Sequence, residues 1–119
     1  YGAYDLCVRQ GTIDQVAQEM EHYLSLQQKY YDEGNVPETV KYALQFDKCI
    51  VTGTKNSYLI SMYEHIEDIF YLMALHSNQR GEDDRHNNFT EHKMILKSIQ
   101  EHDAAALHKW LGIHYDKHL

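Results

Sequence analysis

The feature that most constrains the fold is a helical spacing of apolar residues along most of the chain. Apolar side chains recur at three- and four-residue intervals in several segments, and residues that favour helix ends separate these segments. The chain has a single proline, so long helices are permitted. We therefore predict an all-α fold, an antiparallel helical bundle of about five to six helices that forms one domain over residues 1–119.

The expected helix boundaries follow from start and stop signals. Thr12 and Gln15 match a capping box at the start of one helix. Asn88 and Glu91 match a second capping box, and Pro37 suits a first helical turn. The expected helices cover residues 12–31, 37–52, 57–76, 89–101 and 104–118, with a short helical start within residues 1–10 and a polar loop over residues 77–87.

The helix expected over residues 57–76 carries its apolar residues on one side. The members of this side repeat every three or four positions, which is typical of a side that packs against other helices. They are Leu59, Met62, Ile66, Ile69, Phe70 and Met73.

The charge and the cysteines exclude several classes of protein. The net charge is −7 and no stripe of lysine and arginine is present, which argues against binding of a nucleic-acid backbone by this domain alone. Cys7 and Cys49 make no disulfide framework and are expected to be free thiols in a reducing compartment. No apolar run is long enough to span a membrane and no signal peptide is visible, so we expect a cytoplasmic protein without membrane contact. Because the first residue is a tyrosine, we expect the chain to be a fragment of a longer protein.

Two histidines lie at matching places on the last two expected helices. His92 precedes Asp103 by eleven residues, and His114 follows it by eleven residues. Aspartate is a preferred N-cap, so we expect the chain to turn at Asp103, and each histidine then lies about 16 Å along its helix from the turn. Both histidines also fall on apolar sides, so the sequence predicts two imidazoles opposite each other in the core.

A carboxylate occupies a similar position on an earlier helix. Asp47 lies in the middle of an apolar side, and an unpaired buried carboxylate costs several kcal/mol, so it needs a partner. One interpretation is a divalent metal (zinc, nickel, manganese or iron) held by Asp47, His92 and His114. The other is a metal-free hydrogen bond between Asp47 and a histidine. A di-iron bundle is disfavoured because the chain has only one E-x-x-H motif of the required kind, Glu19 with His22.

Five short segments occur in an order and spacing typical of a known family. They are Phe46-Asp47, Thr54-Lys55-Asn56-Ser57-Tyr58-Leu59, Glu91-His92-Lys93-Met94-Ile95-Leu96-Lys97-Ser98-Ile99, Asp103-Ala104-Ala105-Ala106 and His114-Tyr115. Together they resemble the FCD domain, the C-terminal effector-binding and dimerisation domain of FadR-type GntR transcriptional regulators. The resemblance covers roughly residues 12–118.

This resemblance implies partners and a ligand set. Family members bind a small-molecule effector, form homodimers and contact DNA through an N-terminal winged helix-turn-helix domain, which is absent from this chain. Many of them hold a metal through an aspartate, a histidine four residues later and two further histidines. By position these ligands correspond to Ala43, Asp47, His92 and His114. Ala43 cannot bind a metal, so the resemblance leaves a set of two histidines and one carboxylate.

We therefore predict the effector-sensing and dimerisation domain of a transcriptional regulator, and not an enzyme. A small molecule, expected to be a carboxylate, would enter the bundle core and complete the coordination of the metal. Further contacts with the effector are assigned to Tyr63, Arg80, Arg85 and Asn56. Two alternatives stay open: a mononuclear metalloenzyme with a two-His-one-carboxylate site, and a metal-free structural dimerisation bundle.

Overall fold

The computed structural model describes residues 2–78 and 82–116, with side chains at all of these positions except 74, 77, 78, 82–88, 115 and 116. Within this part, the chain forms six α-helices and no strand. They are α1 (Gly2–Gln10), α2 (Ile13–Asp32), α3 (Val36–Gly53), α4 (Ser57–Asn78), α5 (Glu82–Gln100) and α6 (Ala104–Asp116). The prediction of an all-α bundle is confirmed, and the short helix expected within residues 1–10 is α1.

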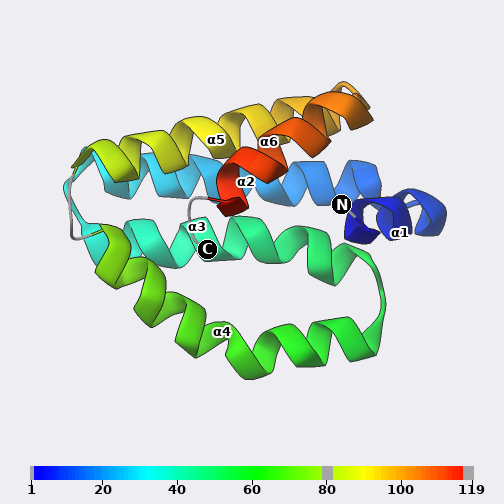
Figure 1. Ribbon diagram of the computed structural model, residues 1–119, viewed down its shortest axis with the longest axis horizontal. Helices are drawn as coiled ribbons and strands as arrows, with labels where there is room; N and C mark the ends of the chain where they lie inside the picture. Colours follow the sequence, from blue (N-terminus) through cyan, green and yellow to red (C-terminus); the bar gives the residue numbers. More distant parts are fainter. Residues whose placement is uncertain (1, 79–81, 117–119) are drawn as a thin grey trace.

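The helices pack around a central pair formed by α2 and α3, whose contact is the most extensive between any two helices (Figure 1). α5 packs on α2, and α6 packs on α5. α4 packs on α3 and has few contacts with α5. α1 packs against the first turn of α2 and the last turns of α3 (Figure 1). None of the helices in the described ranges is long and apolar enough to cross a membrane.

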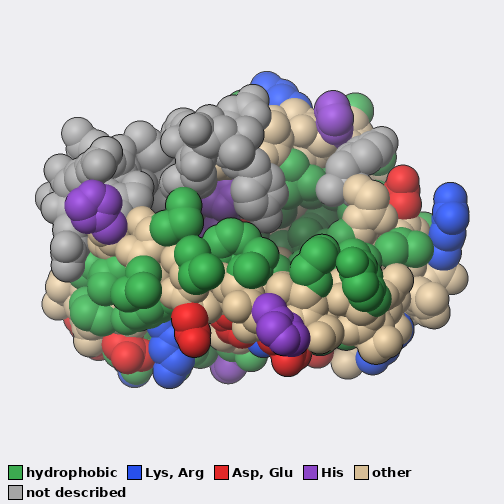
Figure 2. Space-filling model, turned by 60° about the horizontal axis from the view of Figure 1, so that its bottom comes forward, with side chains coloured by type: hydrophobic (Ala, Val, Ile, Leu, Met, Phe, Trp, Pro, Cys, Tyr) green, Lys and Arg blue, Asp and Glu red, His purple; other side chains and the backbone are tan. Residues whose placement is uncertain are grey.

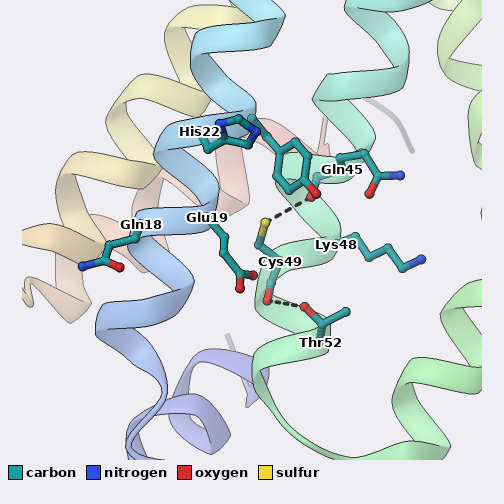
Figure 3. Close-up of a pocket in the computed structure, with 8 residues that line it drawn as sticks. Gln18, Glu19, His22, Gln45, Lys48, Cys49 and Thr52 are labelled. Carbon is teal, nitrogen blue, oxygen red and sulfur yellow. Dashed lines mark hydrogen bonds between the residues drawn. The ribbon is translucent and has the colours of Figure 1, made fainter.

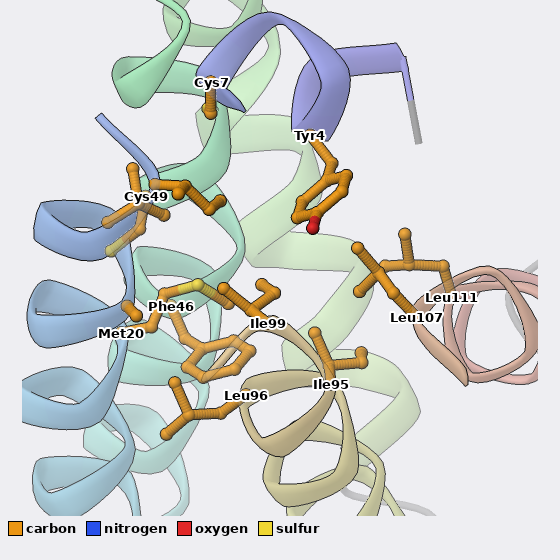
Figure 4. Close-up of a cluster of buried hydrophobic side chains, with 13 residues drawn as sticks. Tyr4, Cys7, Met20, Phe46, Cys49, Ile95, Leu96, Ile99, Leu107 and Leu111 are labelled. Carbon is orange, nitrogen blue, oxygen red and sulfur yellow. The ribbon is translucent and has the colours of Figure 1, made fainter. Parts of the chain in front are cut away.

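The core lies between α2, α3, α5 and α6, and Tyr4 and Cys7 of α1 extend it at one end. Its largest fully buried apolar side chains are Phe46, Met20, Ile95, Ile99 and Leu107 (Figure 4). They come from helices whose apolar residues repeat at helical spacing, as the sequence predicts. Since burial of one such side chain is worth about 1.5–3 kcal/mol, the apolar sides of these helices supply most of the packing energy that holds the bundle together.

Three helices begin with side-chain caps. Asn35 and Asn56 cap α3 and α4, because their side-chain oxygens accept hydrogen bonds from backbone N–H groups of the first turn. Asp103 caps α6 in the same way and accepts from the N–H of Ala106 at 3.0 Å. These caps satisfy donors that a helix start otherwise leaves without partners. The predicted turn at Asp103 is confirmed.

Thr12 precedes α2 as expected, but the predicted capping box with Gln15 is not formed. The Thr12 side chain makes no cap hydrogen bond, and its hydroxyl instead donates to the carbonyl oxygen of Gly53 at 2.6 Å. This bond joins the start of α2 to the end of α3. A Cβ atom at Gly53 would overlap the side chain of Val16, so the close approach of the two helices requires a glycine.

The prediction of a polar loop over residues 77–87 is wrong for its described part. α4 continues to Asn78, and α5 begins at Glu82, so Asn88 lies inside a helix and is not an N-cap. Residues 79–81 lie outside the described residues. Of the eight described residues only Glu82 and Arg85 are good helix formers, so the helix forms here against local propensity, which is a weak guide that tertiary context overrides. At the other end, α6 is described to Asp116, and residues 117 and 118 of the expected helix lie outside the described residues.

The apolar side of α4 is only partly covered by the described part of the chain. Leu59 and Phe70 are half-buried. The other four members of this side, Met62, Ile66, Ile69 and Met73, are exposed. Instead, α4 is held to α3 by a neighbouring side, on which Glu67 accepts hydrogen bonds from Gln45 and Lys48.

Candidate metal centre

Three side chains from three helices bring their polar atoms together in the core. His92 lies on α5, His114 on α6 and Asp47 on α3. The Nε2 atoms of the two histidines are 3.2 Å apart. Oδ1 of Asp47 lies 3.2 Å from Nε2 of His92 and 3.6 Å from Nε2 of His114. The structure therefore brings together the three residues that the sequence singled out, in an arrangement that could hold a metal ion.

The surrounding helices fix the positions of these side chains. The turn at Asp103 places α5 and α6 against each other, so residues at equal distances from the turn meet. The Phe46 ring stacks on the His92 ring, with centroids 4.1 Å apart and planes 15° from parallel. The Asp47 carboxylate, next in sequence, meets the Nε2 edge of the same ring. Both histidines are buried, whereas the Asp47 side chain is 17% exposed, so the cluster is most open beside Asp47.

Two further buried residues orient the imidazoles by hydrogen bonds to their Nδ1 atoms, on the opposite side of each ring from Nε2. Nδ1 of His92 donates to Oε1 of Gln27 at 2.8 Å, and Nδ1 of His114 donates to Oε1 of Glu91 at 2.9 Å. The Glu91 carboxylate can only accept, so Nδ1 of His114 carries a hydrogen. Nδ1 of His92 also carries a hydrogen, because the amide oxygen of Gln27 that it meets is an acceptor. Each Nε2 is thus directed at the other histidine and at Asp47, and hydrogen-bonded histidines of this kind are typical of metal sites.

The protonation of the metal-free cluster follows from these contacts. Burial alone would raise the pKa of Asp47, but the charges of His92 and His114 and their hydrogen bonds outweigh burial and hold that pKa well below its ordinary value. Burial lowers the pKa of His92. Burial also acts to lower the pKa of His114, but Asp47 and Glu91 outweigh it and raise that pKa. In the metal-free cluster Asp47 is therefore held as an anion, and a proton binds His114 in preference to His92.

The three polar atoms fit a divalent metal better than they fit this proton. A proton on Nε2 of His114 leaves the His92 lone pair facing the Asp47 oxygen at 3.2 Å, with no hydrogen between them. A tetrahedral site with bonds of about 2.0–2.1 Å separates its ligand atoms by roughly 3.3 Å. The observed separations of 3.2, 3.2 and 3.6 Å lie close to that value. The residues present thus match three ligands of such a site and leave one position open.

The residues assigned to effector contacts are placed differently. The Tyr63 hydroxyl donates to the carbonyl oxygen of Leu44 at 3.5 Å, and burial raises the pKa of Tyr63, with a further rise from the charge of Asp47. Asn56 is exposed, and its side-chain oxygen caps α4. Arg80 lies outside the described residues. Arg85 is part of α5, but its side chain is among those not described.

Sequence reasoning assigned no site role to Gln27 or Glu91. Gln27 falls on the apolar side of α2 and is fully buried, and this burial of a polar residue is the signal that would have identified it. Its Nε2 is the buried side-chain nitrogen that lacks a hydrogen-bond partner among the described residues. Glu91 was interpreted as part of a capping box, yet it lies within α5 and is buried beside His114.

A shallow groove between α2 and α3 is a separate feature (Figure 3). Its lining includes Glu19 and His22, the residues of the single E-x-x-H motif, and both are exposed. Cys49 also lines it, and its thiol donates to the carbonyl oxygen of Gln45. Burial raises the pKa of Cys49 to about 12, so the thiol stays protonated and is a poor metal ligand or nucleophile. Within the described residues, the only metal-type cluster is the one formed by Asp47, His92 and His114.

Fold and cluster together define a helical domain with a metal-type site in its core. The chain matches the family model of the FCD domain over residues 2–117, and it belongs to this family. FCD domains are the effector-binding part of GntR-family transcriptional regulators, which are not enzymes. The resemblance seen in the sequence is thereby confirmed, and the metalloenzyme alternative is not supported. Comparison with curated proteins and with solved structures finds no match.

Proposed function

We propose that this domain senses a small carboxylate effector at a divalent metal held by Asp47, His92 and His114. The observation that carries the proposal is the set of short separations among the three polar atoms, 3.2, 3.2 and 3.6 Å. One divalent cation satisfies all three atoms, whereas one proton does not. Zinc, nickel, manganese and iron all accept imidazole nitrogen and carboxylate oxygen. Such an ion supplies positive charge and an open coordination position, both of which suit a carboxylate ligand.

The surroundings of Asp47 are compatible with an anionic effector. The cluster is most open beside Asp47, and the Tyr63 side chain on α4 approaches α3 one turn away, at Leu44. Glu67 on α4 is ion-paired with Lys48 at 3.1 Å, so its charge is locally compensated and opposes an anion less. Tyr63, with Arg80, Arg85 and Asn56, remains a candidate for further contacts with the effector.

Regulation would then follow from a change in helix arrangement. The cluster joins α3, α5 and α6, so an effector that binds there can favour one arrangement of these helices over another. The domain would act as a homodimer in the cytoplasm, and it would contact DNA only through a separate N-terminal domain. The change in DNA affinity can be no larger than the difference in effector affinity between the two arrangements, typically about 1–3 kcal/mol.

The first test is metal content, measured by elemental analysis on protein purified without an affinity tag or chelator. Near-stoichiometric metal is expected in the wild type, with loss in Asp47→Ala and in His92→Ala. His22→Ala is the matched control, because it removes an exposed histidine outside the cluster. An effector screen would follow, in which small carboxylates raise the melting temperature of the metal-loaded protein and not of the Asp47→Ala variant.

Absence of metal in the wild type, even after reconstitution with all four ions, would refute the metal-centred proposal. The metal-free alternative would then hold, with the imidazolium of His114 between Asp47 and Glu91 as a buried structural network. Loss of metal in His22→Ala but not in Asp47→Ala would place the metal elsewhere on the chain and would also refute it.

A further inference from the structure

α4 is the helix that contributes least to the core. Among its described side chains none is buried, whereas α3 buries six of its residues. The large hydrophobic side chains of α4 lie mostly at the surface, and Figure 2 shows such side chains gathered on this side of the molecule. A helix that buries few apolar side chains separates from its domain at a low cost in free energy. This makes α4 the element of the bundle best suited to open.

Three polar contacts join the middle of α4 to α3. Gln45 and Lys48 donate to the two carboxylate oxygens of Glu67, at 3.3 and 3.1 Å, and these three side chains are called the latch here. The Tyr63 hydroxyl donates to the carbonyl oxygen of Leu44 at 3.5 Å, which is a weak bond. The side chains of Lys48 and Glu67 are 20% and 26% exposed, so water can solvate both charges when the latch breaks.

The latch lies beside the most open member of the metal-type cluster. Asp47 immediately precedes Lys48 in α3 and follows Leu44 by three residues, so contacts from α4 flank it on both sides. Burial raises the pKa of Tyr63 and the charge of Asp47 raises it further, because these two side chains lie near each other. The Asp47 side chain is 17% exposed, whereas both histidines of the cluster are buried. α4 thus covers the side on which the cluster is closest to solvent.

The start of α4 is anchored, which gives the helix a fixed end about which to turn. Thr54 is buried, and its hydroxyl donates to the carbonyl oxygen of Val51 at 2.6 Å and accepts from the N–H of Asn56 at 3.2 Å. Asn56 in turn caps α4. Lys55, between them, has a φ of 56°, in the left-handed region. Hinges are commonly a few residues at the end of an element, and this short connection has that position.

We infer that α4 is a lid over the Asp47 side of the cluster, and that release of Glu67 from Gln45 and Lys48 opens it. Opening also changes the charge at the entrance, because Glu67 moves away with α4 while Lys48 stays on α3, next to Asp47. The uncovered lysine then attracts an anion, which competes with Glu67 and favours the open arrangement. The opening itself needs no metal, and its use by a carboxylate effector rests on the proposed function.

Hydrogen exchange of the whole chain, followed by mass spectrometry of its peptides, tests the opening. Peptides from α4 should exchange together and faster than those from α2 and α3. Glu67→Gln removes the charge of the latch and should speed exchange in α4 about threefold or more, with exchange in α2 unchanged. Glu64→Gln is the matched control, because it removes the same charge from an exposed residue of the same helix, and it should leave exchange in α4 unchanged.

Thiol labelling tests whether α4 covers the cluster. Asp47→Cys places a thiol at the covered position, whereas Cys7 and Cys49 are buried and should react slowly. Added to Asp47→Cys, Glu67→Gln should speed the reaction with a disulfide reagent by the same factor as it speeds exchange in α4. Glu64→Gln, added in the same way, should not. Circular dichroism checks that each variant keeps its helices.

Three results would overturn the inference. The first is exchange in α4 that is no faster than exchange in α2 and α3. The second is an equal effect of Glu67→Gln and Glu64→Gln on exchange, since the latch would then have no role of its own. The third is faster exchange in Glu67→Gln without faster labelling, because α4 would then open without uncovering Asp47. Neither measurement uses a metal, so this inference and the metal proposal can fail separately.

Discussion

Replacing Asp47 with asparagine should destabilise the metal-free domain at pH 6 and much less at pH 9. Asparagine keeps the size of the side chain and removes the charge that faces the proton on His114. Removal of one partner from a buried ion pair costs about 3–5 kcal/mol. The Asp47 side chain is 17% exposed, and Glu91 remains hydrogen-bonded to His114. We therefore expect a loss of about 2–3 kcal/mol in the free energy of unfolding at pH 6, below the full range for a buried pair.

The stability that the charge of His114 contributes should decrease as the pH rises. The pKa of His114 is raised in the folded state, so the stability that its charge contributes is complete below its unfolded pKa of about 6.5. This contribution is lost as the pH rises through the folded pKa. Once His114 is neutral, the charge of Asp47 has no cation to stabilise. The difference between wild type and Asp47→Asn should therefore shrink toward zero at pH 9.

Urea unfolding in the presence of a chelator, followed by circular dichroism at pH 6 and pH 9, measures this effect. Asp14→Asn is the matched control, because Asp14 lies 3.8 Å from Nε2 of His102 and both side chains are largely exposed. This surface pair should change stability by no more than about 0.5 kcal/mol at either pH. An equal loss at both pH values for Asp47→Asn would refute the assignment of the proton to His114.

Three further predictions concern side chains around the core. Gln27→Leu removes the acceptor behind His92 and should weaken zinc binding by about 10–100-fold in a competition titration, with the helical content retained. Gly53→Ala forces a Cβ against Val16 and should destabilise the domain by about 1–3 kcal/mol, visible as a lower urea midpoint. Because burial raises the pKa of Cys49 to about 12, its thiol should react with a disulfide reagent at pH 8 far more slowly than a free thiol, until denaturant is added.

Much of the fold and the three central residues of the site could be predicted because local sequence determines them. Helical spacing is a property of neighbouring residues, and Asp103 caps a helix within its own first turn. Once the turn at Asp103 is known, equal distances along two packed helices bring His92 and His114 together. Asp47 could be added because a carboxylate on an apolar side needs a partner.

Gln27 and Glu91, which hydrogen-bond to the Nδ1 atoms of the two histidines, could not be predicted in this way. His92 meets Gln27 across 65 residues of sequence, and His114 meets Glu91 across 23 residues. Such pairs depend on the rotation of each helix about its axis, which spacing alone leaves undetermined. Glu91 also fitted a capping box that was wrong, since the helix begins nine residues earlier at Glu82.

The apolar side of α4 shows a related limit of sequence patterns. A repeat of three and four residues shows that one side of a helix is apolar, but it does not show what covers that side. Met20 on α2 is fully buried by its own chain, whereas Ile69 on α4 is 56% exposed. The structure separates the two cases.

Ala43 has a consequence for what the site can do. It is buried one turn before Asp47 on α3, at the position where the family resemblance implies a metal-binding aspartate, so a methyl group stands in place of a carboxylate. A site with four protein ligands is closed and holds its metal for structure, whereas a site with three leaves a position for water or for a ligand. Gln27 and Glu91 hold the two imidazoles in orientation whether or not that fourth group is present. In the proposed metal site, an alanine at position 43 would therefore lower the affinity for a metal and leave more room for an effector.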